Sequence, residues 1–345
     1  MGAPFALPPG RVWASRPPDQ PLRHVRTMRM AEDLLPDATG IARAAALLRA
    51  GALVALPSET VYGLAADATQ DSAVAAIYTA KGRPDFNPLI VHLPDLDSAM
   101  AIADFPGTAR ALADAFWPGP LTLVLPLKPG HGLDARVTAG HATVAIRLPA
   151  HPVMQAVLQA AARPIAAPSA NPSGKISATT AAHVRAGLGG RIAAILDGGP
   201  TPVGVESTIL APGADGTRLL REGAIPREVI TPITGPLITD TTPGARVEAP
   251  GQLASHYAPL TPLHLGGTAQ PGEIIIGFGP MACALNLSEN GDLVEAATRL
   301  FAMLHQADAM AQSHSAPAIR VAPIPEMGLG RAINDRLRRA AAPRA

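Results

Sequence analysis

Helix-like and strand-like runs alternate along the chain from about residue 40, and this alternation limits the fold more than any other feature. The run 41–51 has apolar residues at helical spacing and stops at Gly51, a residue type that often follows the last helical turn. The next run, 52–57, is short, apolar and ended by Pro57, which is typical of a buried strand. Because some neighbouring strands have no helix between them, the pattern predicts an α/β fold with a mixed sheet. Further strands are predicted at 89–93, 121–127, 143–148, 163–169, 192–199 and 207–211, and helices at 71–82, 107–117, 151–162 and 178–187.

The alternation stops between residues 231 and 262, where Pro, Gly and Thr dominate without a clear period. Such a composition is typical of a linker. A smaller α/β unit follows, with strand-like runs such as EIIIGFG and a long amphipathic helix at 292–310. A chain of 345 residues is long enough for two domains that each have a core. We therefore predict a disordered N-terminal extension at 1–30, a larger catalytic domain at 31–235, a linker at 236–261 and a C-terminal α/β domain at 262–345.

Charge and cysteine content exclude several classes of function. The formal net charge is +1, so bulk electrostatics favour neither a nucleic acid nor a membrane surface as partner. Cys283 is the single cysteine, which excludes an intramolecular disulfide and any cysteine-cluster metal site. No apolar run reaches the roughly 18 residues that a membrane span needs. We therefore expect a cytoplasmic protein without a membrane partner.

Several catalytic signatures are missing from the sequence. The ten histidines include no H-x-x-x-H pair for zinc, and the chain has neither G-x-S-x-G nor a G-x-G-x-x-G that follows a strand. The stretch SANPSGKIS (169–177) matches a phosphate-binding P-loop only superficially. Ser169 stands where the first Gly is needed, and Ile176 separates Lys175 from the following hydroxyl. The sequence therefore favours a chemistry that needs none of these motifs.

Polar side chains follow the predicted strands at several points. Taken singly, each cluster also fits helix caps, turns and solvated charges. Together they supply hydroxyls, amides and cations with few acids, which suits a site for polyanions. A reaction at phosphorus can run on positioning and charge stabilisation without a covalent protein nucleophile. The clusters are Ser58, Glu59, Thr60 and Tyr62; Lys81, Arg83 and Asn87; Thr143, Arg147 and His151; Ser169, Asn171, Ser173, Lys175 and Ser177; Ser207 and Thr208; and Arg221.

These clusters belong to a longer series of motifs: PSETVYGLAADA, KGRP with NPLIVH, WPGPLTLVL, VAIRLPAH, APSANPSGKIS, DGG with GVESTI, and LREGAI. In this order the motifs resemble the YrdC-type threonylcarbamoyl-AMP synthase family, and APGQLASHYAPLTP resembles the linker of its longer, two-domain form. The resemblance is dense over about residues 40–265 and looser beyond them. It implies a YrdC-like twisted mixed sheet with flanking helices, plus a smaller C-terminal α/β domain that is Rossmann-like.

The resemblance implies a nucleotidyltransferase that condenses L-threonine, bicarbonate and ATP to L-threonylcarbamoyladenylate and releases pyrophosphate. Mg²⁺ would accompany ATP. The product would pass to the tRNA threonylcarbamoyl transferase machinery, which modifies the adenosine next to the anticodon, and weak direct contact with tRNA is compatible with this function.

Two other functions stay open. An RNA-binding module with a YrdC-like fold would use the same cations. A carbamoyl-adenylate-forming enzyme would use a similar nucleotide site, but that role usually accompanies acylphosphatase and zinc-finger segments, and this chain has no Cys-x-x-Cys.

Matching motif by motif assigns roles to individual residues. The L-threonine site would use Thr60, His92, Arg147, the backbone of Ala167, and Ser207. The ATP site would use Arg83, Asn87, Thr143, Ser169, Ser177, Arg221 and, from the linker, Tyr257. Lys81 and Arg83 would act catalytically near the phosphates, and no metal site made by the protein itself is expected.

Two positions depart from the family pattern. PSET stands where PTET is commoner, and SATT (177–180) stands where Ser-Pro-Thr is usual. The hydroxyl of Ser177 is retained, while the missing proline loosens the constraint on that turn.

Overall fold

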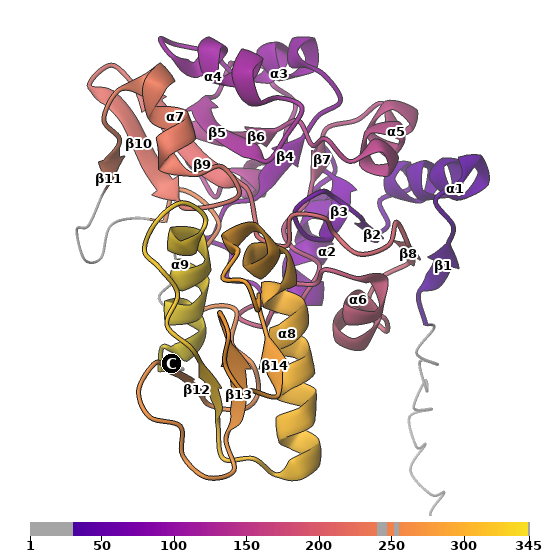
Figure 1. Cartoon of the computed structure of the whole chain (residues 1–345). Helices are drawn as coiled ribbons and strands as arrows, with labels where there is room; N and C mark the ends of the chain where they lie inside the picture. The colour runs from indigo at the N-terminus through magenta and orange to yellow at the C-terminus, as the bar shows by residue number, and fades with distance from the viewer. Residues whose placement is uncertain (1–29, 240–246, 252–254, 344–345) are drawn as a thin grey trace, which may run out of the picture.

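The computed structural model describes residues 30–239, 247–251 and 255–343, which form two α/β bodies connected by a linker (Figure 1). The predicted N-terminal extension lies outside the described residues except for Met30, and part of the predicted linker does too. In the described part of the chain, no helix is both long enough and apolar enough to cross a membrane.

The larger body is built on one twisted sheet. Within the described residues, its eleven strands run in the order β1-β8-β2-β3-β7-β4-β6-β5-β9-β10-β11. Parallel pairs such as β4 with β6 and antiparallel pairs such as β5 with β6 both occur, so the predicted mixed sheet is confirmed. The strands are β1 (Glu32–Leu34), β2 (Val54–Leu56), β3 (Gly63–Asp67), β4 (Ile90–His92), β5 (Leu121–Pro126), β6 (Thr143–Arg147), β7 (Ile165–Ala166), β8 (Ala194–Leu196), β9 (Thr208–Gly213), β10 (Gly216–Arg221) and β11 (Ile238–Thr239).

Helices pack on both faces of this sheet, because alternate residues of a strand point to opposite sides. Val54 and Leu56 of β2 belong to the hydrophobic cluster shared with α1 and α5. Ala55, between them, belongs to the cluster shared with α2, α4 and α6. The helices of this body are α1 (Ala38–Arg49), α2 (Asp71–Lys81), α3 (Leu96–Ile102), α4 (Ala109–Phe116), α5 (Pro152–Ala161), α6 (Ala181–Leu188) and α7 (Arg227–Thr234), with a short 3₁₀ turn, η1 (Ala135–Val137).

Capping residues set the helix ends. α1 begins before the predicted residue 41 because the Asp37 carboxylate accepts a hydrogen bond from the Gly40 N–H at 2.8 Å. α2 ends at Lys81, one residue before the predicted residue 82, because Gly82 has a left-handed φ of 60° and ends the helix. α6 begins later than the predicted residue 178, because Thr180 caps it by accepting from the His183 N–H.

The smaller body has a four-stranded sheet in the order β12-β15-β13-β14. All its strand pairs are parallel. The helices α8 and α9 lie alongside this sheet (Figure 1). The elements are β12 (Leu263–Leu265), β13 (Ile274–Gly277), β14 (Leu285–Asn286), β15 (Ile319–Val321), α8 (Leu293–His314) and α9 (Gly330–Ala341).

The two bodies share a hydrophobic core. Val61, Ile176 and Val205 of the larger body belong to the same buried cluster as Phe301 and Ile333 of the smaller one. Burial of apolar surface from both sides stabilises their contact, so the bodies are packed together as well as linked.

Candidate active site

A cavity of about 50 Å³ lies where several strand ends of the large sheet meet the linker. Residues predicted for the threonine and ATP sites come together on its wall: Thr60, Arg83, His92, Arg147, Ala167, Ser169, Ser207, Arg221 and Tyr257. The predicted Lys81, Asn87, Thr143 and Ser177 do not line the cavity. Lys81, Asn87 and Ser177 instead hydrogen-bond residues close to it, and Thr143 is half-buried at the start of β6.

Arg147, the last residue of β6, is fixed in place by several partners. Its Nη1 donates to the Thr60 hydroxyl at 2.9 Å, and its Nη2 lies 2.7 Å from a carboxylate oxygen of Glu59. Its Nε donates to the Gly119 carbonyl at 3.3 Å. Burial alone would raise the pKa of Glu59, but the Arg147 guanidinium lowers it below its ordinary value, so the pair stays charged.

His92, at the end of β4, lies next to this pair. Burial, and then the charge of Arg147, lower the pKa of His92 to about 3. Its ring is therefore neutral at physiological pH. Nδ1 lies 3.2 Å from the Ile90 carbonyl, which can only accept, so this contact puts the ring proton on Nδ1. A neutral imidazole in this position can hydrogen-bond a substrate but adds no charge.

Two buried cations lie at the C-terminal end of α2: Lys81 is its last residue, and Arg83 is two residues beyond it. Lys81 donates to the carbonyls of Ser169 and Asn171, each at 2.5 Å. Arg83 donates through Nη2 to the Asn87 side-chain oxygen and the Pro88 carbonyl, both at 2.7 Å. Burial lowers the pKa of Lys81 well below its ordinary value and that of Arg83 to about 10, and the Arg83 charge lowers the pKa of Lys81 further.

Among the described residues, neither cation forms an ion pair with a carboxylate. Two neighbouring cations that are out of water and lack counter-charges favour the binding of an anion.

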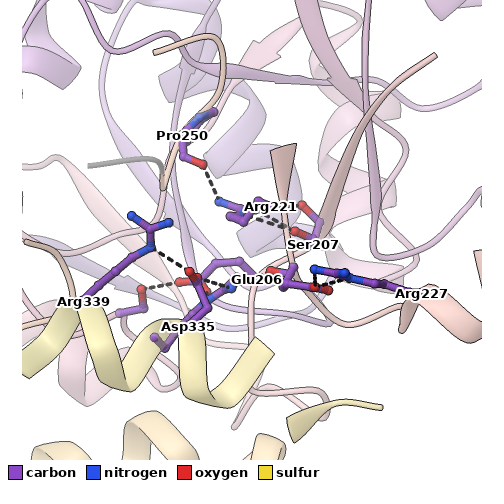
Figure 2. Close-up of polar contacts among 10 residues, drawn as sticks. Glu206, Ser207, Arg221, Arg227, Pro250, Asp335 and Arg339 are labelled. Carbon is purple, nitrogen blue, oxygen red and sulfur yellow. Dashed lines mark hydrogen bonds and ion pairs between the residues drawn. The ribbon is translucent and has the colours of Figure 1, made fainter. Parts of the chain in front are cut away.

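Arg221, at the end of β10, hydrogen-bonds Ser207, the residue just before β9. Its Nη2 donates to the carbonyl and the hydroxyl of Ser207 at 2.9 and 3.1 Å, and its Nη1 donates to the Pro250 carbonyl of the linker at 3.1 Å (Figure 2). The Thr122 hydroxyl lies 2.7 Å from that of Ser207. Residue 223, close to this contact between Arg221 and Ser207, has to be glycine, because a Cβ there would lie 2.3 Å from the Thr208 nitrogen.

The linker covers the cavity with Pro250, Gly251, His256 and Tyr257. Tyr257 is almost fully buried, and its ring centroid lies 4.0 Å from that of His256 and 5.5 Å from that of Phe301 in α8. Its φ of 62° is in the left-handed region, which costs a non-glycine residue about 1–2 kcal/mol. Strain of this kind is typical of functional positions.

Comparisons with known proteins identify both bodies. Residues 46–223 match the family model described as telomere recombination, and residues 225–342 match the one described as threonylcarbamoyl-AMP synthase, C-terminal domain. Threonylcarbamoyl-AMP synthase of Bacillus subtilis is 45% identical over 238 residues, which are 68% of this chain and 68% of the relative.

The chain belongs to the threonylcarbamoyl-AMP synthase family.

Solved structures of the threonylcarbamoyl-AMP synthase family have the same two-body fold. The structure of Pyrococcus abyssi Sua5 in complex with L-threonine aligns with a TM-score of 0.83 at 35% identity, over 91% of this chain and 98% of the other. A variant of the P. abyssi protein with a histidine and a tyrosine changed to alanine aligns with a TM-score of 0.81 at 34% identity, over 90% and 96% of the chains. The predicted fold class is thus confirmed, and as a member of this synthase family the protein is an enzyme.

Two residues beside the threonylcarbamoyl-AMP synthase site were not singled out from the sequence. Glu206, inside the motif GVESTI, lines the cavity, and Arg336 of α9 pairs with it. Their signal in the sequence is weak, because α9 contains several arginines. Only the helical spacing of Arg336 with Ile333, Leu337 and Ala340 puts it on the apolar side of the helix.

Across the described residues of this synthase, no cluster of three or more His, Cys, Asp or Glu side chains is arranged to hold a metal ion. Glu59 and Glu206 lie beside the cavity, but each pairs with an arginine. Their oxygens are therefore poorly placed to act as ligands of a hard cation as well.

Proposed function

We propose that the protein condenses L-threonine, bicarbonate and ATP to L-threonylcarbamoyladenylate and releases pyrophosphate. The observation that carries the proposal is the meeting of the buried cations Arg83, Arg147 and Arg221 with hydroxyls at one cavity. This donor set suits a carboxylate and a polyphosphate. The proposal is also supported by the names of the relatives and by the L-threonine bound to the P. abyssi neighbour.

The threonine half of the site centres on Arg147. Its guanidinium would bind the substrate carboxylate, for which it is pre-oriented by Thr60 and Glu59. Neutral His92, the Ser207 hydroxyl and the Ala167 backbone would contact the rest of the amino acid. Fixing the amino acid in this way would hold its amine against the bicarbonate-derived carbon.

The ATP half would use Arg83 and Arg221 as phosphate donors, with Asn87 holding Arg83 in position. Ser169, Ser177 and Thr143 would contact the nucleotide, and Tyr257 would cover it. Lys81 would fix the 169–171 loop through its two carbonyl contacts and add positive charge near the phosphates.

The chemistry would proceed in two steps. The threonine ammonium and bicarbonate first give a carbamate, with loss of one water and one proton. A carbamate oxygen then attacks the α-phosphorus of ATP and the bond to pyrophosphate breaks. Charge builds up on the phosphate oxygens, where pre-placed cations stabilise it most. Mg²⁺ would accompany ATP and be ligated mainly by phosphate oxygens, since the neighbouring carboxylates are engaged by arginines.

One observation favours the synthase over an RNA-binding module. Arg83, Arg147 and Arg221 have exposed fractions of 9%, 4% and 7%, so they are turned away from the surface that an RNA backbone would contact. RNA binding relies on exposed cations along a groove or face. The proposed route of the product, to the modification of the tRNA adenosine next to the anticodon, needs no tight RNA binding by this chain.

Pyrophosphate release from ATP tests the proposal, with threonine and bicarbonate varied independently and the adenylate product measured by mass spectrometry. We expect release only when both are present. Release that is indifferent to threonine would exclude the synthase. Release that needs carbamoyl phosphate would instead indicate a carbamoyl-adenylate-forming enzyme.

A further inference from the structure

The loop that carries Glu206 is docked on the C-terminal domain. Gly204, with φ of 80°, lies so close to α8 that a Cβ would be 2.4 Å from the carbonyl oxygens of Ala297 and Thr298. The Thr298 hydroxyl donates to the Pro202 carbonyl at 3.0 Å. The second domain therefore sets the position of this loop of the active site.

Arg336 of α9 reaches the same loop from the other side. It is fully buried, and its Nε donates to a Glu206 carboxylate oxygen at 2.9 Å. Its Nη1 donates to the Glu222 backbone carbonyl and to a carboxylate oxygen of Asp335. Glu206 and Asp335, both labelled in Figure 2, thus contact the same guanidinium. The guanidinium carbon also lies 5.6 Å from the centroid of the Tyr257 ring.

The second oxygen of Glu206 connects this pair to the nucleotide half of the site. It accepts a hydrogen bond of 2.6 Å from the hydroxyl of Ser177, a residue assigned above to ATP. Nε2 of His305, also from the C-terminal domain, lies 3.1 Å from the Ser177 carbonyl. Glu206 itself lines the cavity together with Arg221. It is thus a buried negative charge in the part of the site where phosphates would bind.

We propose that Arg336 is a positioning residue that the C-terminal domain contributes to the ATP half of the site, an inference that rests on the proposed function. It neutralises Glu206 and holds that carboxylate so that Ser177 is oriented and Arg221 stays available for phosphate. Without Arg336, an unpaired carboxylate would face the incoming polyphosphate in a medium of low dielectric constant, where like charges repel strongly. The C-terminal domain is in this way part of the nucleotide site.

The test compares full-length variants in the pyrophosphate assay and by calorimetric binding of ATP. Arg336→Met removes the charge and keeps much of the side-chain volume. We expect about a tenfold or greater rise in the KM and Kd for ATP, with the KM for threonine changed by less than about twofold. Arg338→Gln, on the exposed side of the same helix, is the matched control and should match the parent.

The double variant Glu206→Gln/Arg336→Met distinguishes two roles of Arg336: positioning and neutralising Glu206 for ATP binding, or only stabilising the contact between the domains. The amide that Glu206→Gln introduces is not charged and can still accept from Ser177, so ATP affinity should return to within about threefold of Glu206→Gln alone. A lower melting temperature with unchanged ATP affinity would overturn the proposal, and so would a double variant that is as impaired as Arg336→Met.

A second variant and an activity assay of the parent protein keep the proposal testable if Arg336→Met fails to fold or if the proposed function is wrong. If Arg336→Met does not fold, Arg336→Lys is used, because it keeps the positive charge. Arg336→Lys should retain most of the affinity for ATP. A rise of about tenfold or more in its Kd for ATP, the size expected for loss of the charge, would contradict the proposal. Threonine-dependent turnover by the parent protein reports on the proposed function separately. A parent that lacks this turnover would refute the function, while the ATP calorimetry would still test Arg336.

Discussion

Replacing Arg147 tests the threonine site most directly at the scale of single residues. Arg147→Ala removes the proposed carboxylate partner and leaves Glu59 without its counter-ion. The loss of one charged hydrogen bond is worth about 1.5–3 kcal/mol, so we expect threonine binding to weaken roughly ten- to a hundredfold. ATP binding should change much less. Calorimetric titration with each ligand measures both effects.

Arg163→Ala is the control for this prediction, because Arg163 is an arginine of the same domain with an exposed side chain. It should leave both affinities unchanged. Equal losses of threonine and ATP affinity in Arg147→Ala would show that Arg147 supports the whole site and does not bind the amino acid.

His92 gives a prediction about pH. Burial and Arg147 lower its pKa to about 3, so the folded protein keeps the ring neutral while the unfolded chain takes up a proton below about pH 6.5. The stability that His92 contributes is therefore complete above pH 6.5 and is lost as the pH falls toward 3. The free energy of unfolding in urea should fall between pH 6 and pH 4 in both proteins. The fall should be less steep in His92→Gln than in the parent, and the two slopes should differ by up to about 1.4 kcal/mol per pH unit. Identical slopes would show that His92 is protonated in the folded state.

Single residues also show what the sequence can and cannot predict. Some of the polar residues placed after strands, among them Thr60, Arg147 and Ser207, line one cavity, because strand ends bring such loops together. The sequence did not indicate that Lys81 and Asn87 support the site through hydrogen bonds from outside the cavity wall. Arg336 was missed because its partner Glu206 is 130 residues away in the chain, and no local pattern records such a pair.

At the scale of elements, Gly204 and Gly199 make a matched pair. Both have φ of 80°, so alanine at either position costs about 1–2 kcal/mol of backbone strain. Only at Gly204 would the new methyl group collide with α8; nothing lies within 4 Å of a Cβ at Gly199. We expect Gly204→Ala to lower the free energy of unfolding in urea by about 1–3 kcal/mol more than Gly199→Ala. Equal losses would mean that the loop does not need its close contact with the second domain.

Element types were easier to predict than element lengths. Long periodic runs such as those of α2 and α8 were recognised because a 3.6-residue period is repeated several times. The predicted strand 163–169 is only Ile165–Ala166, since its second half turns into the cavity wall at Ala167 and Ser169. The edge strands β1 and β11, with three and two residues, were missed because so short a segment has no detectable alternation.

At the scale of the whole molecule, the two bodies depend on each other. The sequence predicted a second domain but not that Val61, Ile176 and Val205 would be buried against it. Those residues look like ordinary interior positions of the first domain, and only the assembled fold shows which domain covers them. Two members of the shared core, Val61 of the first domain and Tyr257 of the linker, line the cavity, so packing of the second domain supports part of the wall of the site.

This arrangement also limits how substrates reach the site. A cavity of about 50 Å³ is far below the roughly 300–1,000 Å³ of pockets that hold ligands of this size. The proposed binding of ATP would therefore require part of the wall to move. Other wall residues outside helices and strands, such as Thr60 and Ser207, lie in loops that join strands of the large sheet. The linker residues Pro250, Gly251, His256 and Tyr257 instead connect the two domains, so we expect this part of the wall to move without breaking a sheet.

The last prediction concerns Tyr257 as a cover over the bound nucleotide. Its ring is buried between His256 and Phe301, and its backbone is strained, so the closed position must be stabilised by the contacts of the ring. Tyr257→Ala removes those contacts and keeps the strain, which should hold the cover open and admit water to the reactive mixed anhydride.

We expect Tyr257→Ala to lower kcat/KM for ATP by about tenfold or more, while Tyr257→Phe, which keeps the ring, retains most activity. ATP and threonine together should slow proteolysis of the linker in the parent and in Tyr257→Phe, but not in Tyr257→Ala. If Tyr257→Ala turns over ATP like the parent, or if the cleavage rate ignores both ligands, the linker only connects the domains, and another part of the wall must open to admit the nucleotide.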